Sequence, residues 1–168
     1  MKYAALLCIC CSVAGVGAAA SVRSRRRVSA LSGFAAFFDA LSLSAAMYGG
    51  EVQALLAYCE GICPAGLHFP AALRKALANK PDVAGAWAVS AAGCEEARFL
   101  TPEERALLSS FGAAFSDTSL EAFREKCAGC RARFIALCAE AQEKNRRNGK
   151  LYITFSSLFA ALLFIILV

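Results

Sequence analysis

Nine cysteines are the residues of this 168-residue chain with the widest chemical scope, because a thiolate can bind a metal, attack a substrate or form a disulfide. Four of them form two close pairs, Cys59 with Cys63 and Cys127 with Cys130 in the sequence CAGC. A structural zinc site uses four such ligands, usually as two close pairs on turns or loops. A cysteine-based metal or redox module anchored in the membrane is therefore one hypothesis for this chain.

The second cysteine pair, however, lies in a long helical pattern. Apolar residues recur there at steps of three or four: Leu120, Phe123, Cys127, Cys130, Phe134, Leu137 and Cys138. Such positions fall in one stripe along a helix, so we expect the thiols to pack as small apolar side chains facing a core. We favour this packing over zinc or redox chemistry, and we expect no metal and no cofactor.

Other groups that catalyse reactions are sparse. The single histidine, His68, is expected to begin a helix or to lie on the surface. Two pairs of adjacent glutamates stand at predicted helix starts, where negative charge is favoured by the helix dipole: Glu95 with Glu96, and Glu103 with Glu104. The sequence holds no phosphate-binding glycine loop and no nucleophile with a recognisable base. It therefore predicts a protein that is not an enzyme.

Both ends of the chain are apolar over the length of a membrane-spanning helix. Residues 3–22 contain no charge, and neither do residues 151–168. At about 1.5 Å of rise per residue, each helix reaches close to the ~30 Å of bilayer hydrocarbon. We predict transmembrane helices at residues 1–22 and 150–168, flanking a helical domain at residues 23–149. A cleaved secretory signal is the alternative for the first segment, because Lys2 gives a basic start and residues 18–20 are small alanines.

Eight of the 18 basic residues lie beside these two segments. They form two groups, here called the basic collars: Arg23, Arg25, Arg26 and Arg27, and Lys144, Arg146, Arg147 and Lys150. Basic residues beside a span tend to stay in the cytoplasm. The collars therefore predict a two-pass protein of the cell membrane with a cytoplasmic central domain. Residues 28–143 hold nine basic and 13 acidic residues, so we expect no nucleic-acid partner.

Between the collars the chain is expected to be all-α, because apolar residues recur at helical spacing and no strand pattern of useful length occurs. The first helix is predicted at residues 28–48, with a core stripe of Leu31, Phe34, Phe38, Leu41, Ala45 and Tyr48. Five more helices are predicted to start near Glu51, Pro70, Pro81, Pro102, and Asp117 or Thr118. Thr101 with Glu104 forms a capping-box sequence, and Glu121 offers a second one. The prediction is a cytoplasmic six-helix bundle.

Several stretches in this order resemble one known family. They are Tyr48 in the first helix, Ala86 with Trp87 mid-domain, the sequence LTPEERALLSSFG at residues 100–112, and Lys150, Leu151 and Tyr152 leading into ALLFIILV. Their order, their spacing and the chain length together resemble the stage III sporulation protein AB family of endospore-forming bacteria. The resemblance covers nearly the whole chain.

This resemblance implies a role in spore formation. Family members belong to an assembly in the mother-cell membrane around the forespore, and their cytoplasmic part is similar to the six-helix domains of type II secretion and type IV pilus platform proteins. The implied partners are a secretion-type ATPase of the same operon (stage III sporulation protein AA) and other membrane subunits of the complex. The two apolar segments predict membrane lipid as a further partner. We predict the partner-binding surface at Phe111, Gly112 and Asp117, between the fifth and sixth helices; an ordinary interhelical turn is the alternative.

Overall fold

The computed structural model describes the backbone of residues 2–48, 52–79, 82–115 and 119–167, and the side chains of residues 21–45, 47, 52–79, 82–115 and 119–148. Within these ranges the chain forms six α-helices and two short 3₁₀ turns with no strand, which confirms the all-α prediction. The helices are α1 (Lys2–Tyr48), α2 (Val52–Ile62), α3 (Phe69–Asn79), α4 (Val83–Gly93), α5 (Pro102–Ser110) and α6 (Leu120–Leu167), with the turns η1 (Glu95–Arg98) and η2 (Phe111–Phe115).

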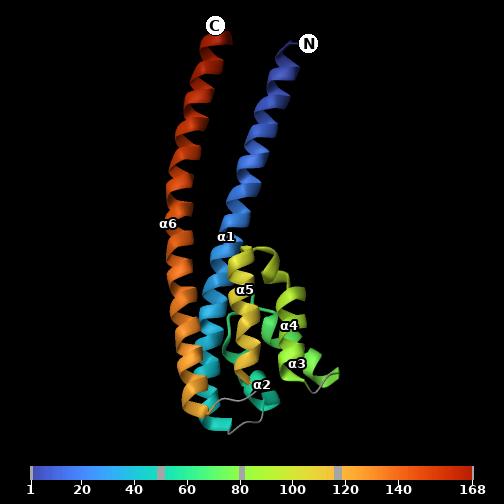
Figure 1. The fold of residues 1–168 in the computed structure, drawn as a ribbon. Helices are drawn as coiled ribbons and strands as arrows, with labels where there is room; N and C mark the ends of the chain where they lie inside the picture. The colour runs from blue at the N-terminus through green and yellow to red at the C-terminus, as the bar shows by residue number, and fades with distance from the viewer. Residues whose placement is uncertain (1, 49–51, 80–81, 116–118, 168) are drawn as a thin grey trace.

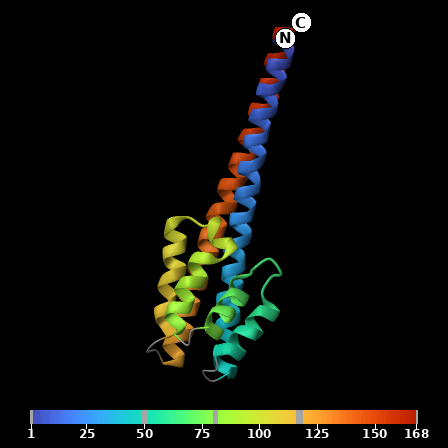
Figure 2. The ribbon, with the colours of Figure 1, turned by 90° about the vertical axis from the view of Figure 1, so that its right-hand side faces the viewer.

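The helices α1 and α6 form the long axis of the molecule (Figure 1). They run antiparallel: the rings of Phe34 and Phe134 lie 5.6 Å apart, and the thiol of Cys138 lies 3.7 Å from the carbonyl oxygen of Val28. The shorter helices α2–α5 pack beside one half of this pair. The N-terminal part of α1 and the C-terminal part of α6 project beyond the bundle at the same end, where both chain termini lie (Figures 1 and 2).

Among the residues with described side chains, one stretch is long and apolar enough to cross a membrane, Ser21–Ala45. In the most apolar 18 consecutive residues of this stretch, 61% of the residues are buried inside the bundle, as in a core helix. The spans predicted at residues 1–22 and 150–168 form the projecting helix ends, but nearly all their side chains lie outside the described residues. Their insertion into a membrane stays a prediction.

Aromatic side chains fill the centre of the bundle. Phe34, Phe37 and Phe38 of α1 are fully buried, as is Trp87 of α4. The indole N–H of Trp87 donates to the carbonyl oxygen of Leu108 at 2.7 Å, so burial leaves this polar group paired. The predicted core stripe of α1 omitted Phe37. This residue is buried because α1 is covered on two sides, by α6 and by the shorter helices, and Phe37 contacts Trp87 on the second side.

Helix starts follow local capping chemistry, and two predicted starts were wrong. Helix α4 begins at Val83 and not at Pro81, because the carboxylate of Asp82 accepts hydrogen bonds from the amides of Ala84 and Gly85 at 3.1 and 3.0 Å. Pro81 itself lies outside the described residues. Confirmed features are the first-turn position of Pro70 in α3 and the capping box of Thr101 and Glu104 in α5.

The start of α6 also differs from its prediction. The helix begins at Leu120, and the hydroxyl of Ser119 accepts from the amide of Ala122 at 3.3 Å. With Ser119 as the cap, Glu121 is one position too early to complete a capping box. Asp117 and Thr118 lie outside the described residues. Leu120 is 49% exposed and so does not belong to the buried stripe, whereas the other members of that stripe are buried or partly buried.

Candidate partner-binding groove

Two of the three predicted partner-binding residues lie in η2 and are buried. The ring of Phe111 lies 4.8 Å from that of Phe38 and 5.2 Å from that of Trp87. A Cβ atom at Gly112 would lie 3.0 Å from Cδ1 of Trp87 and 3.1 Å from its Cβ and Cγ, so any side chain here would require Trp87 to shift by a few tenths of an ångström. Asp117 lies outside the described residues. These contacts give Phe111 and Gly112 a packing role, and direct contact with a partner stays a prediction.

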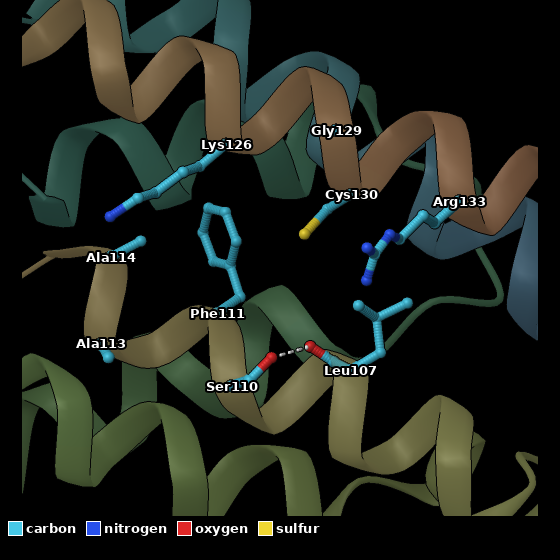
Figure 3. Close-up of a pocket in the computed structure, with 9 residues that line it drawn as sticks. All are labelled: Leu107, Ser110, Phe111, Ala113, Ala114, Lys126, Gly129, Cys130 and Arg133. Atoms are coloured by element: carbon cyan, nitrogen blue, oxygen red, sulfur yellow. Dashed lines mark hydrogen bonds between the residues drawn. The ribbon is translucent and has the colours of Figure 1, made fainter.

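A groove of about 350 Å³ opens beside these residues, between α5–η2 and α6 (Figure 3). It is called the η2 groove below. Figure 3 shows the ring of Phe111 in its centre, pointing toward α6, with Lys126 and Arg133 on either side. The remaining lining is small or apolar: Leu107, Ser110, Ala113, Ala114, Gly129 and Cys130.

The η2 groove combines an apolar floor with positive charge at its rim. Lys126 and Arg133 are seven residues apart on α6, which corresponds to about two helical turns or ~10 Å. Between them, a Cβ at Gly129 would have no atom within 4 Å, so the groove is open at this position. Apolar contact flanked by cations suits an amphipathic helix or loop that carries carboxylates.

The side chains of the four cysteines named in the zinc hypothesis pack in or against the hydrophobic core. Cys59 and Cys127 are fully buried, and Cys63 and Cys130 are partly buried against the core. Burial, reinforced by neighbouring thiols, raises the pKa of Cys127 to about 12 and that of Cys63 to about 11. A thiolate is the form that binds metals and attacks substrates, so these thiols are poorly suited to either role at neutral pH. The described residues contain no group of three or more His, Cys, Asp or Glu placed to hold a metal.

Two arginines of the first basic collar dock onto the bundle, which the sequence did not indicate. Nη2 of Arg27 lies 2.6 Å from Oε1 of Glu104, and its Nε lies 3.3 Å from Oε2. The guanidinium of Arg26 lies over the ring of Phe99, 5.4 Å from its centroid. The only sequence signal for the ion pair was the capping-box glutamate, whose partner lies 77 positions away.

The second collar makes a different kind of contact. Arg146 pairs with Glu143 of its own helix, with Nε 3.0 Å from Oε2, and both side chains are mostly exposed. Lys150 lies outside the residues with described side chains. How either collar sits relative to a membrane stays a prediction.

His68 and the glutamate pair at residues 95–96 hold a loop in place. His68 precedes α3 and is exposed, as expected, and its backbone N–H donates to Oε1 of Glu96. Glu96 is only 6% exposed, and its other carboxylate oxygen has no hydrogen-bond partner among the described residues. Glu96 lies in the first turn of η1, and its carboxylate also binds the loop that precedes α3.

Comparison with protein-family models matches residues 2–168 to the family described as stage III sporulation protein AB. No curated protein and no solved structure gives a significant match. The family match includes the bundle and both projecting helix ends, so it confirms the family that the sequence resembles. This chain belongs to the stage III sporulation protein AB family.

Proposed function

We propose that the chain is a two-pass membrane subunit of a stage III sporulation assembly, and that its bundle is a platform for a secretion-type ATPase. Membership of the family supports a role in stage III of sporulation. The observation that carries the membrane part of the proposal is the exit of α1 and α6 from the same end of the bundle (Figure 1). Two helices that cross a bilayer from that end leave the whole bundle on one side.

The basic collars support a cytoplasmic position for that bundle. They lie on α1 and α6 between the bundle and the predicted spans, where positive charge favours the cytoplasmic side. The proposed role is one of position and contact, and it requires no reaction at the chain itself. The two long helices α1 and α6 continue from the bundle into the predicted spans. A movement of the bound ATPase would therefore displace the predicted spans through these helices.

We propose the η2 groove as the docking site for the ATPase, stage III sporulation protein AA. Its apolar floor and its two rim cations fit an amphipathic segment with carboxylates. Arg133 lies 17 residues before residue 150, which places it about 25 Å along α6 from the predicted span. A cytoplasmic partner can therefore approach the groove without contacting lipid.

Binding of purified ATPase to the detergent-solubilised full chain tests the docking site. Gly129→Leu fills the groove from a position with free space around it, and Arg133→Glu reverses one rim charge. We expect each to weaken binding about tenfold or more, because the leucine side chain occupies the space that the partner would fill and the glutamate repels the partner's carboxylates. The matched controls are Gly61→Leu, equally unhindered but in α2, and Arg124→Glu, exposed on α6 outside the groove lining. Equal binding by the groove variants and their controls would exclude this site.

A tag inserted in the exposed loop at residues 64–66 tests the orientation separately. In intact sporulating cells, we expect an external protease to leave the tag uncut until the membrane is permeabilised. Cleavage in intact cells would place the bundle outside and remove the ATPase as a partner.

A further inference from the structure

A second cleft lies where α1 and α6 leave the bundle. It has a volume of about 430 Å³ and lies between the two helices. Helix α1 contributes Ser21 and Arg25, and α6 contributes Gln142, Asn145 and Arg146. One arginine from each basic collar therefore lines the same cleft, although the two are 121 positions apart in the sequence.

Apart from Val28, every residue of the lining carries a side-chain hydrogen-bond donor; Ser29 is the remaining one, and the amide of Gln142 also donates to the thiol of Cys138 at 3.6 Å. A guanidinium offers a planar fork of N–H groups that matches two phosphate oxygens, and the two serine hydroxyls and the two side-chain amides can donate further bonds. Arg146 also pairs with Glu143, but both side chains are more than half exposed, and such a pair contributes little free energy. A ligand with several negative oxygens can therefore compete for this arginine.

The position of the cleft identifies the source of such a ligand. Ser21 lies at the end of the first predicted span, and Arg146 lies four residues before the second. A cleft at this level adjoins the lipid headgroups of the leaflet that faces the bundle. We propose that it binds the phosphate group of an anionic lipid, and this inference rests on the proposed two-pass insertion.

Thermal unfolding of the detergent-solubilised full chain, followed through the fluorescence of Trp87, measures this binding. Titration compares phosphatidylglycerol with phosphatidylcholine in about 0.5 M salt, which screens attraction that does not involve close contact. We expect tighter binding of phosphatidylglycerol. The double variant Arg25→Gln/Arg146→Gln is expected to bind phosphatidylglycerol at least about tenfold more weakly, because two contacts to the phosphate are lost.

The control is Arg23→Gln with Arg147→Gln, which removes the same charge from the same collars but outside the cleft lining. We expect it to change the affinity less than about threefold, because screened charges at a distance contribute little. Equal losses in the two double variants would overturn the proposal, as would equal binding of both lipids. Inorganic phosphate that stabilises the chain as strongly as phosphatidylglycerol would also overturn the lipid assignment.

Extraction of cell membranes with alkaline carbonate separates failure of this inference from failure of the proposed function. A chain that is released by carbonate lacks the proposed spans. A chain that resists extraction but binds both lipids equally retains its proposed place in the membrane and loses only the lipid site.

Discussion

Arg27 of α1, which is partly exposed, and Glu104 of α5, which is buried, form an ion pair with Nη2 of the arginine 2.6 Å from Oε1 of the glutamate. Glu104 is only 2% exposed, and its Oε2 also accepts from the amide of Thr101 at 2.7 Å. One carboxylate thus completes the capping box of α5 and joins that helix to α1. Because α5 forms a wall of the η2 groove, the pair connects the groove to the helix that leads to the first predicted span.

Arg27→Ala is expected to destabilise the bundle by about 3 kcal/mol, because it leaves the buried carboxylate of Glu104 without its cation. The measurement is chemical denaturation of the detergent-solubilised chain. Trp87 is the only tryptophan and is fully buried, so its fluorescence reports on the core. Arg23→Ala, an exposed arginine of the same collar, should change the free energy of unfolding by less than about 0.5 kcal/mol. A similar small effect of Arg27→Ala would show that the pair contributes little.

The same pair predicts how stability depends on pH. Burial alone would raise the pKa of Glu104, but hydrogen bonds from Arg27 and from the Thr101 amide lower it below its usual value. A carboxylate with a lowered pKa in the folded state stabilises the protein above its unfolded-state pKa of about 4.3, and this contribution is lost as the pH falls through the folded-state value. We expect this contribution to stability to be lost as the pH falls below about 4.3.

Glu104→Gln should lose less stability over that pH range than the unsubstituted chain, because it has no proton to gain at this site. The control is Glu103→Gln, whose side chain is exposed on the same turn. Denaturation curves at each pH provide the comparison. If the free energy of unfolding falls with pH equally in the Glu104→Gln variant and the unsubstituted chain, other groups cause the acid sensitivity.

Local chemistry made the helices predictable from sequence. The capping box at Thr101 and Glu104 fixed the start of α5 correctly, because its bonds join residues three positions apart. The cysteine stripe of α6 correctly predicted buried thiols at Cys127 and Cys138, because helical periodicity places them on one face. The helix starts predicted next to Pro81 and Thr118 were wrong, because any of several neighbouring polar residues can cap a helix. The caps in the structure are Asp82 for α4 and Ser119 for α6.

Long-range contacts were not predictable in the same way. The collar arginines were assigned to membrane orientation alone, because nothing near Arg27 in the sequence points to Glu104. The η2 groove adjoins the predicted partner-binding segment, yet its rim residues Lys126 and Arg133 come from α6. Their relation to Phe111 depends on how α6 packs against η2, and a single sequence does not specify that packing.

The close approach of Gly112 to Trp87 gives a steric prediction. Gly112→Ala is expected to destabilise the bundle by about 1–3 kcal/mol, because the new methyl group would lie 3.0–3.1 Å from indole and Cβ atoms that are themselves buried. Gly129→Ala is the matched control in a helix interior with no atom within 4 Å. It should stabilise α6 by about 0.5–1 kcal/mol. Denaturation followed by circular dichroism compares the two, and a neutral Gly112→Ala would mean that Trp87 can shift freely.

Burial of the cysteines predicts their reactivity. With a pKa of about 12, only about one in 10⁴ Cys127 thiols is ionised at pH 8, and the side chain is fully buried. We expect an alkylating reagent to modify Cys127 in the native chain no faster than the bundle unfolds. Mass spectrometry of peptides from native and denatured samples gives the two rates, and the denatured sample is the control for intrinsic reactivity.

Metal content distinguishes packing from the metal hypothesis for the same cysteines. If the thiols only fill the core, the purified full chain should carry far less than one zinc per molecule, and a chelator should leave its unfolding midpoint unchanged. Cys127→Ala should lower the free energy of unfolding by about 1 kcal/mol, because packing contacts are lost. Cys127→Ser should lower it further, because it buries a hydroxyl group where an apolar group fits better. Equal effects of the two substitutions, together with stoichiometric zinc that protects Cys127 from alkylation, would instead make the thiol a ligand.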